Sequence, residues 1–216
     1  MTLTLRAFTV GPLQENCYLL VDDQAGEAVL VDPGAEGERL AEAVRATGAR
    51  LVGIWLTHAH FDHVGGVAAL KREFPGARIH LHPDDQPLYD RAVQSAAKWG
   101  LEVEPPPPAD VRLAEGDVLT LGRHSFSVWH APGHAPGHVV IHGHGLAFVG
   151  DCLFAGSVGR TDLPLADPRM LARSLERIIE LPPGTRALPG HGPETTIATE
   201  RLSNPFLNGD VRLVRE

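Results

Sequence analysis

The chain has 216 residues, of which 43% are hydrophobic, and it carries a formal net charge of −8. This length and composition suit one sizeable core, so we predict a single domain over residues 1–216. The acidic balance argues against a nucleic-acid binder, which normally carries a basic patch, and we expect no nucleic acid among its partners.

The sequence also bears on where the protein is located. Residues 1–10 lack the long apolar core of a signal peptide, and no apolar run reaches the length of a membrane span. Cys17 and Cys152 are too few for a disulfide framework. We therefore expect a cytoplasmic protein with no membrane partner, and we make no prediction of its oligomeric state.

Apolar runs and helical spacing predict an alternation of strands and helices. Strands are expected at residues 3–9, 17–21, 28–32, 51–57, 78–81, 118–121, 125–130, 138–141, 146–150 and 186–188. Helices are expected at residues 36–47, 64–74, 86–99, 168–180 and 196–203. Asp167 followed by Pro168 is typical of an N-cap and a first helical residue.

A proline-rich segment lies near the middle of the chain. Residues 101–110 contain four consecutive prolines, which exclude a regular helix or a central strand. We predict a stiff surface connection there. Each flanking half has strands followed by helices, which indicates two similar layers.

The most informative motif extends from Thr57 to His63, directly after an apolar run. His58 and His60 are two residues apart, so they point to the same side of an extended segment. Asp62 and His63 follow where the chain should enter a helix. Imidazole nitrogens and carboxylate oxygens are ligands that zinc, iron and manganese accept. These two adjacent pairs are enough to begin two metal sites.

Further candidate ligands stand in loops elsewhere in the chain. His134 lies in a Gly/Pro-rich turn, Asp151 ends an apolar run, and His191 lies between two glycines. Loops at strand ends are where rigid folds place their chemistry, and glycines allow a close backbone approach. Asp32, at another strand end, is expected to accept the second N–H of a ligand histidine.

In chain order, these motifs resemble the metallo-β-lactamase superfamily: His-x-His-x-Asp-His, an isolated His, Gly-Asp, and Gly-His-Gly. The resemblance implies an α/β fold, a four-layer αβ/βα sandwich of two mixed β-sheets flanked by helices. It also implies a metal site at one edge of the sandwich. The ligands it implies are His58, His60 and His134 for a first metal, Asp62, His63 and His191 for a second, and Asp151 as the bridge.

Within the superfamily, residues 150–162 resemble the short, single-domain relatives of glyoxalase II, the hydroxyacylglutathione hydrolases. The resemblance implies a small-molecule thioester substrate, possibly linked to glutathione, such as S-D-lactoylglutathione. Arg160 is the candidate for binding a substrate carboxylate. The best-known metallo-β-lactamases have a cysteine at the position of Asp151, so we do not expect a β-lactam substrate.

The expected chemistry is hydrolysis by a dinuclear metal centre. A water that bridges two metal ions should ionise near neutral pH and attack the thioester carbonyl. The leaving thiolate needs no strong general acid. We expect two divalent ions, with zinc first and iron or manganese as alternatives, and we assign Asp62, His58 and His60 to catalysis.

Three other functions are alternatives to the hydrolysis of a thioester. Residues 159–162 also resemble the persulfide dioxygenases, iron enzymes of the same fold, so a mononuclear iron persulfide dioxygenase is the alternative. A nuclease of this fold would need a basic groove, and the chain has only two lysines, Lys71 and Lys98. A non-catalytic metal-binding protein is the further alternative.

Overall fold

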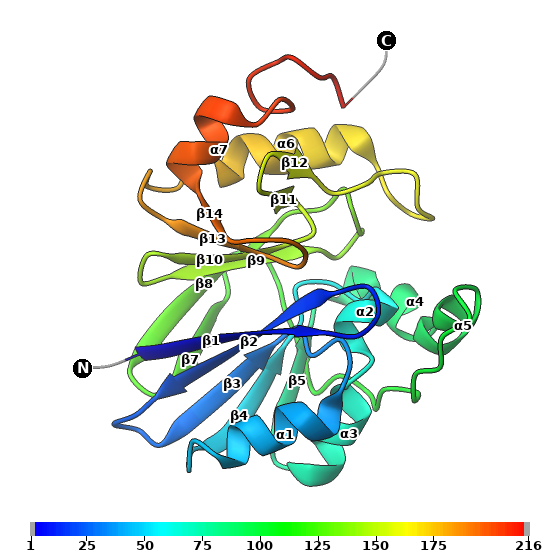
Figure 1. The fold of residues 1–216 in the computed structure, drawn as a ribbon, viewed down its shortest axis with the longest axis vertical. Coiled ribbons are helices and arrows are strands. Elements are labelled where there is room, and N and C mark those ends of the chain that lie inside the picture. Colours follow the sequence, from blue (N-terminus) through cyan, green and yellow to red (C-terminus); the bar gives the residue numbers. More distant parts are fainter. Residues whose placement is uncertain (1–2, 214–216) are drawn as a thin grey trace.

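The computed structural model describes residues 3–213, in which two mixed six-stranded sheets face each other (Figure 1). The first sheet has the order β1-β2-β3-β4-β5-β6. Its strands are β1 (Leu3–Val10), β2 (Glu15–Asp22), β3 (Glu27–Val31), β4 (Arg50–Trp55), β5 (Arg78–Leu81) and β6 (Val111–Arg112).

The second sheet has the order β14-β13-β10-β9-β8-β7. Its strands are β7 (Val118–Leu121), β8 (His124–His130), β9 (Val139–Gly143), β10 (Leu146–Gly150), β13 (Arg186–Pro189) and β14 (Thr195–Thr196). A separate two-stranded ribbon, β11 (Leu153–Phe154) and β12 (Ser157–Val158), follows β10.

Helices cover the outer face of each sheet (Figure 1). The first sheet carries α1 (Gly37–Arg45) and α3 (Val67–Glu73), and the second carries α6 (Pro168–Ile178) and α7 (Ile197–Ser203). The short helices are α2 (Phe61–Val64), η1 (Pro83–Asp85), α4 (Gln86–Tyr89) and α5 (Ala92–Ala97). The architecture is the four-layer αβ/βα sandwich that the sequence predicted.

The apolar strand runs arise because the sheets are buried on both faces. In β2, Cys17, Leu19 and Val21 pack in the cluster beneath α1 and α3, whereas Tyr18 and Leu20 pack against the second sheet. Strand β10 divides in the same way between the central cluster and the one beneath α6 and α7. Successive side chains of a strand point to opposite faces, so both sets must be apolar.

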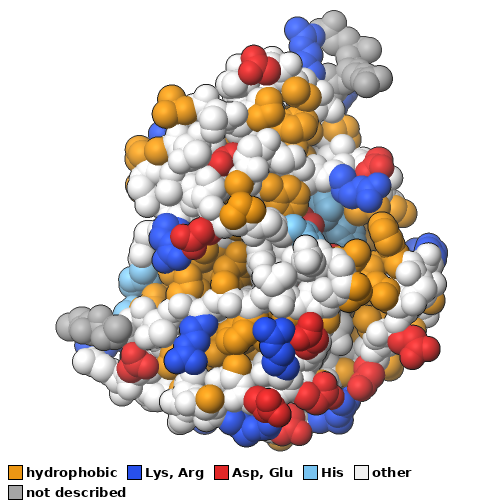
Figure 2. Space-filling model, in the orientation of Figure 1, with side chains coloured by type: hydrophobic (Ala, Val, Ile, Leu, Met, Phe, Trp, Pro, Cys, Tyr) orange, Lys and Arg blue, Asp and Glu red, His pale blue; other side chains and the backbone are white. Residues whose placement is uncertain are grey.

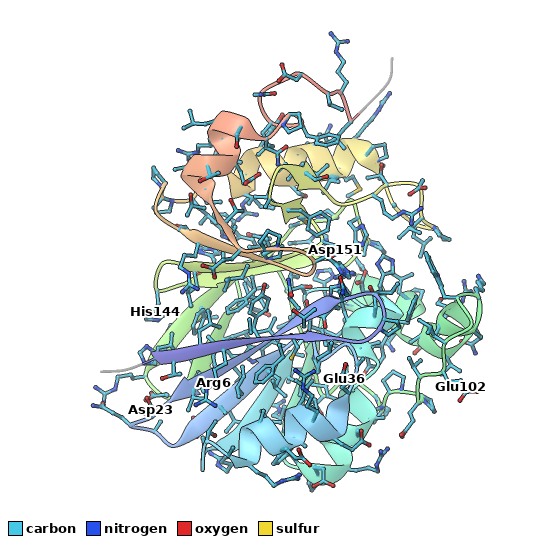
Figure 3. All side chains as sticks on the ribbon, viewed as in Figure 1. Arg6, Asp23, Glu36, Glu102, His144 and Asp151 are labelled. Atoms are coloured by element: carbon cyan, nitrogen blue, oxygen red, sulfur yellow. The ribbon has the colours of Figure 1, made fainter. Side chains whose placement is uncertain are left out.

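Strand direction decides where the loops gather. Strands β3, β4 and β5 are parallel, as are β10 and β13 in the second sheet. The carboxyl ends of parallel strands meet at one edge of a sheet. Figure 3 shows Asp151 at such an edge, between the two sheets, with Asp23 and His144 at the far end of the sandwich.

Two predicted helices are interrupted in the structure. The helix expected at residues 64–74 is found as α3, whereas Val64 ends α2, and Gly65 and Gly66 separate the two helices. The loop at Pro33 and Gly34 packs there, and a Cβ on either separating glycine would press on its carbonyl oxygens. The helix expected at residues 86–99 is α4 and α5.

Other differences concern short elements. The two-residue strands β6, β11, β12 and β14 were not predicted, because they are too short for a periodic pattern. The proline-rich segment is irregular, as expected, but β6 follows it and still pairs with β5, so the first layer extends past it. The Asp167 cap is confirmed: its Oδ1 accepts hydrogen bonds from the amides of Arg169 and Met170.

Each helix within residues 3–213 falls short of the length and apolarity needed to cross a bilayer. The single-domain and cytoplasmic assignments stay predictions.

The central layer provides a test of packing between the sheets. Phe148 is fully buried, and its ring lies 5.5 Å from that of Tyr18 and 6.4 Å from that of Phe126, centroid to centroid. We expect Phe148→Ala to lower the free energy of unfolding by about 3–5 kcal/mol, measured by urea denaturation. The control Val118→Ala, at an exposed position, should change it by less than about 0.5 kcal/mol. Equal losses in both variants would contradict this packing.

Candidate metal centre

All seven predicted ligands converge at the edge where the strand-end loops meet. The loop after β4 supplies His58 and His60, and α2 supplies Asp62 and His63. The second half supplies the other three from the β8–β9 loop, the end of β10 and the end of β13: His134, Asp151 and His191.

The side chains form two groups. His58, His60 and His134 each offer a ligand atom, and these atoms lie within 4.8 Å of one another. His60 Nδ1 lies 2.9 Å from His134 Nε2 within this group. Asp62, His63 and His191 form the second group by the same measure, with Asp62 Oδ2 3.3 Å from His191 Nε2.

Asp151 lies between the groups. Its Oδ2 is 3.5 Å from His134 Nε2 and 3.7 Å from His191 Nε2, and its Oδ1 is 3.5 Å from His63 Nε2. A single carboxylate therefore contacts histidines of both groups, as a bridging ligand would.

Four of the rings are oriented by an oxygen at Nδ1. When Nδ1–H donates to an oxygen, Nε2 keeps its lone pair and faces the centre. The four pairs are His58 with Thr57 Oγ1 at 3.1 Å, His63 with Asp32 Oδ2 at 3.2 Å, His134 with the Arg160 carbonyl at 2.9 Å, and His191 with the Leu13 carbonyl at 3.1 Å.

Asp32 lies where the sequence predicted support for a ligand. Besides its contact with His63, it accepts hydrogen bonds from the Thr57 amide at 2.7 Å and the Thr57 hydroxyl at 2.5 Å. One buried carboxylate thus orients His63 directly and His58 through Thr57. The supporting role of Asp32 and the ligand roles themselves stay predictions.

Three buried side-chain atoms indicate that the residues fit a metal ion. His58 Nε2, His63 Nε2 and Asp151 Oδ1 are buried and have no hydrogen-bond partner within the described part of the chain. Such atoms normally cost about 1–3 kcal/mol each when left without a partner. Metal ions held by the two ligand groups would satisfy all three atoms. A donor set of imidazoles and carboxylates without thiolate suits zinc, iron or manganese.

The first group is kept neutral. Burial lowers the pKa of His58 well below its usual value, and the neighbouring imidazoles lower it further. Burial also lowers the pKa of His60 to about 3, and it lowers the pKa of His134. These rings therefore keep the lone pairs that a metal ion needs at neutral pH.

The second group has the character of a cation site. Burial alone would lower the pKa of His63, but the carboxylates of Asp151, Asp32 and Asp62 together raise it. The Asp62 carboxylate likewise raises the pKa of His191 against the effect of burial. The carboxylates thus create a negative potential that favours positive charge at this point.

Sequence reasoning missed Asp85, which joins the two loops that carry the first group. Its side chain is buried and accepts hydrogen bonds from the amides of Ala59, at 2.8 Å, and Gly137, at 2.5 Å. Burial raises the pKa of Asp85 to about 7, although both amides oppose this shift. Its position after β5, the third parallel strand to end at this edge, was the available signal.

His138 also supports the centre. Its ring stacks on His58 with centroids 4.9 Å apart, and its Nε2 accepts a hydrogen bond from the Asp151 amide. Cys152 lies beside it, with Sγ 3.4 Å from His138 Nδ1. Burial raises the pKa of the Cys152 thiol well above its usual value, which agrees with a structural residue.

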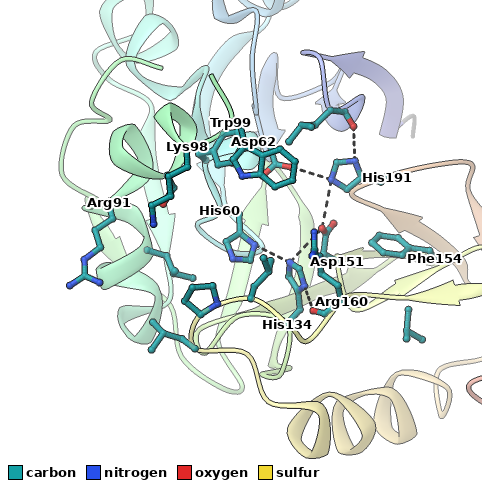
Figure 4. Close-up of a pocket in the computed structure, with 18 of the residues that line it drawn as sticks. His60, Asp62, Arg91, Lys98, Trp99, His134, Asp151, Phe154, Arg160 and His191 are labelled. Atoms are coloured by element: carbon teal, nitrogen blue, oxygen red, sulfur yellow. Dashed lines mark hydrogen bonds and ion pairs between the residues drawn. The ribbon is translucent and has the colours of Figure 1, made fainter. Parts of the chain in front are cut away.

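A cavity of about 760 Å³ opens beside the centre (Figure 4). His60, Asp62 and His191 face it, together with apolar side chains from both halves. In Figure 2, histidine side chains are visible in the hollow between the two halves. Arg160 also lines this cavity, and its guanidinium is held by two hydrogen bonds to Asp162, at 2.6 and 2.7 Å. Its substrate-binding role stays a prediction.

Comparison with known proteins agrees with this geometry. The model of the metallo-β-lactamase superfamily matches residues 10–191, which includes every candidate ligand. The chain belongs to this superfamily. It is 36% identical over 215 residues to the hydroxyacylglutathione hydrolase GloC of Haemophilus influenzae, covering 95% of this chain and 99% of that protein.

Solved structures of the superfamily are also similar. BLEG-1, described as a B3 metallo-β-lactamase, has a TM-score of 0.89 and 38% identity and covers 95% of this chain and 100% of that one. TTHA1623, in a di-iron-bound form, has a TM-score of 0.86 and 48% identity, with 94% and 100% covered. ETHE1 from Myxococcus xanthus has a TM-score of 0.81 and 26% identity, with 95% and 85% covered.

Asp85 gives a test of how the centre is supported. We expect Asp85→Ala to weaken metal affinity about 10- to 100-fold, because both ligand loops lose their shared acceptor. Competition with a chromogenic chelator would measure it. Asp84→Ala removes the exposed neighbouring carboxylate and should leave the affinity unchanged. An Asp85→Ala variant that binds metal as tightly as Asp84→Ala would show that the hydrogen bonds of Asp85 are dispensable for metal binding.

Proposed function

We propose that the protein is a dinuclear metal-dependent hydrolase of thioesters such as S-D-lactoylglutathione. The observation that carries this proposal is the pair of ligand groups sharing Asp151 beside a substrate-sized cavity. Cavities that bind small molecules have volumes of roughly 300–1,000 Å³, and this one lies within that range.

The residues would hold two divalent ions, with zinc first and iron or manganese as alternatives. His58, His60 and His134 would hold one ion and Asp62, His63 and His191 the other, with Asp151 shared. When bound, the ions would supply Lewis acidity and would lower the pKa of a bound water molecule. Because Nδ1 of four rings donates to oxygen, the ligands are preorganised for this task.

Asp62 has a second role in the proposal. Its carboxylate faces the cavity and lies 3.3 Å from His191 Nε2. From there, it can accept a hydrogen bond from the attacking water and orient it toward a substrate carbonyl. His58 and His60 contribute by keeping neutral, fixed rings on the other side of Asp151.

The cavity favours a leaving group that departs as an anion. Every imidazole and carboxylate of the described residues that line it belongs to the proposed ligand set, so none is free to act as a general acid. A thiolate needs no proton to leave, whereas an amine or alkoxide does. Similarity to GloC, named a hydroxyacylglutathione hydrolase, supports the same substrate class.

Two other activities have specific support. The 159–162 segment, which resembles the persulfide dioxygenases, favours a mononuclear iron persulfide dioxygenase as the second candidate. The similarity to BLEG-1 makes β-lactams a substrate class to include in assays, although the sequence argued against them.

The test is hydrolysis of S-D-lactoylglutathione by the purified protein, with metal content measured on the same sample. We expect turnover with about two metal ions per chain, and a loss of at least about a thousandfold in kcat/KM for His58→Ala and His60→Ala. His144→Ala, an exposed histidine outside the centre, is the matched control and should retain activity.

The alternatives give different results in the same samples. Oxygen uptake with glutathione persulfide and one iron per chain would favour the dioxygenase. Hydrolysis of a cephalosporin but not of the thioester would replace thioesters with β-lactams as the substrate class. Thioester hydrolysis that survives both metal removal and His58→Ala would contradict the proposal.

A further inference from the structure

The cavity wall opposite Arg160 is formed by a stripe of side chains from the α4–α5 segment. Leu88, Arg91, Ser95, Lys98 and Trp99 all line the cavity. The first four are three or four residues apart along the α4–α5 segment, and Trp99 directly follows Lys98, so all five face the cavity from this segment. In Figure 4, Arg91, Lys98 and Trp99 lie together on one side, across the cavity from Phe154 and Arg160.

The opposite side of α5 is anchored in the core. Ala92 and Ala96 are buried together with Phe61 of α2 in the apolar cluster that lies beneath α1 and α3. Helix α5 contacts α2, which carries Asp62 and His63, and the Trp99 ring lies 6.4 Å from that of Phe61. The stripe is therefore held against the candidate metal centre by packing.

Arg91 and Lys98 are cations whose side chains have no partner within residues 3–213. Neither makes an ion pair or a side-chain hydrogen bond there, whereas Arg160 on the facing wall is paired with Asp162. Among the described residues that line the cavity, the carboxylates are those of Asp62 and Asp151, which face the histidines. The α5 wall thus offers positive charge that no group within residues 3–213 neutralises.

We infer that Arg91 and Lys98 bind carboxylates of the substrate's thiol carrier and so determine its specificity. The inference rests on the proposed thioesterase function, which it refines. Arg91 and Lys98 cap the two ends of α5, so the helix separates their backbones by roughly 10 Å along its axis. A three-residue carrier such as glutathione, with carboxylates at its two ends, spans a similar length when extended, also roughly 10 Å.

Apolar side chains line both walls of the cavity. Leu88 and Trp99 flank the cations, and Phe154 and Leu165 line the other side. These side chains would contact the uncharged parts of the substrate, and the cations would set its direction. The acyl group then points toward the centre, because the charged ends are held at the α5 wall.

The experiment measures binding of S-hexylglutathione and of its dimethyl ester, in which both carboxylates are masked, by isothermal titration calorimetry. We expect the variant Arg91→Gln/Lys98→Gln to bind the acid at least about tenfold more weakly than wild type does. It should bind the ester as wild type does. Arg173→Gln, an exposed arginine of α6 outside the cavity, is the matched control and should change neither affinity.

Kinetics separate binding from a general structural effect. With S-D-lactoylglutathione, the double variant should raise KM with little change in kcat, and added salt should raise KM less in the variant than in wild type. Equal affinity of the variant and wild type for the acid, or equal weakening for acid and ester, would overturn the inference. Charge-dependent binding without turnover would support the α5 site and overturn the thioesterase proposal instead.

Discussion

The carboxylate of Asp151 is the constraint on which this architecture depends. It lies at the boundary of the two halves and contacts histidines from both: His63 from the first, and His134 and His191 from the second. A buried charge is costly unless it is compensated. Burial alone would raise the pKa of Asp151, but the nearby histidines lower it, chiefly His63. The edge of the sandwich is therefore held together by the same group that would join two metal ions.

Glycines allow this concentration of polar groups. A Cβ at Gly190 would press on both Asp151 Oδ1 and His63, and a Cβ at Gly34 would meet the Asp62 carbonyl. Backbone can thus approach the centre from β3 and β13 without side chains in the way. The β1–β2 hairpin completes the enclosure, because the Leu13 carbonyl holds His191 and the Tyr18 hydroxyl donates to the Pro189 carbonyl at 2.7 Å. The centre is consequently built on rigid elements, as catalysis by positioned charges requires.

Within a family of shared ligands, the walls of the cavity differentiate the members. The ligand set alone suits hydrolysis and iron-dependent oxidation equally well, since both chemistries use imidazole and carboxylate ligands. Substrate choice must then come from the surroundings, where an apolar cavity carries cations on α5 and a paired arginine on the other wall. Because the ligands supply the chemistry and the cavity walls select the substrate, one fold can host several activities.

The sequence by itself determined the layers and the identity of the candidate ligands. Continuous apolar runs predict strands buried on both faces, and the spacing from His58 to His63 leaves little choice of ligand atoms. Tertiary structure decided what local patterns do not contain. Asp85 accepts hydrogen bonds from two loops, and His138 stacks on His58, only because loops distant in sequence meet at the ends of parallel strands. Helix breaks at Gly65 and the charged stripe of α5 likewise depend on which surfaces pack together, and packing is a property of the whole chain.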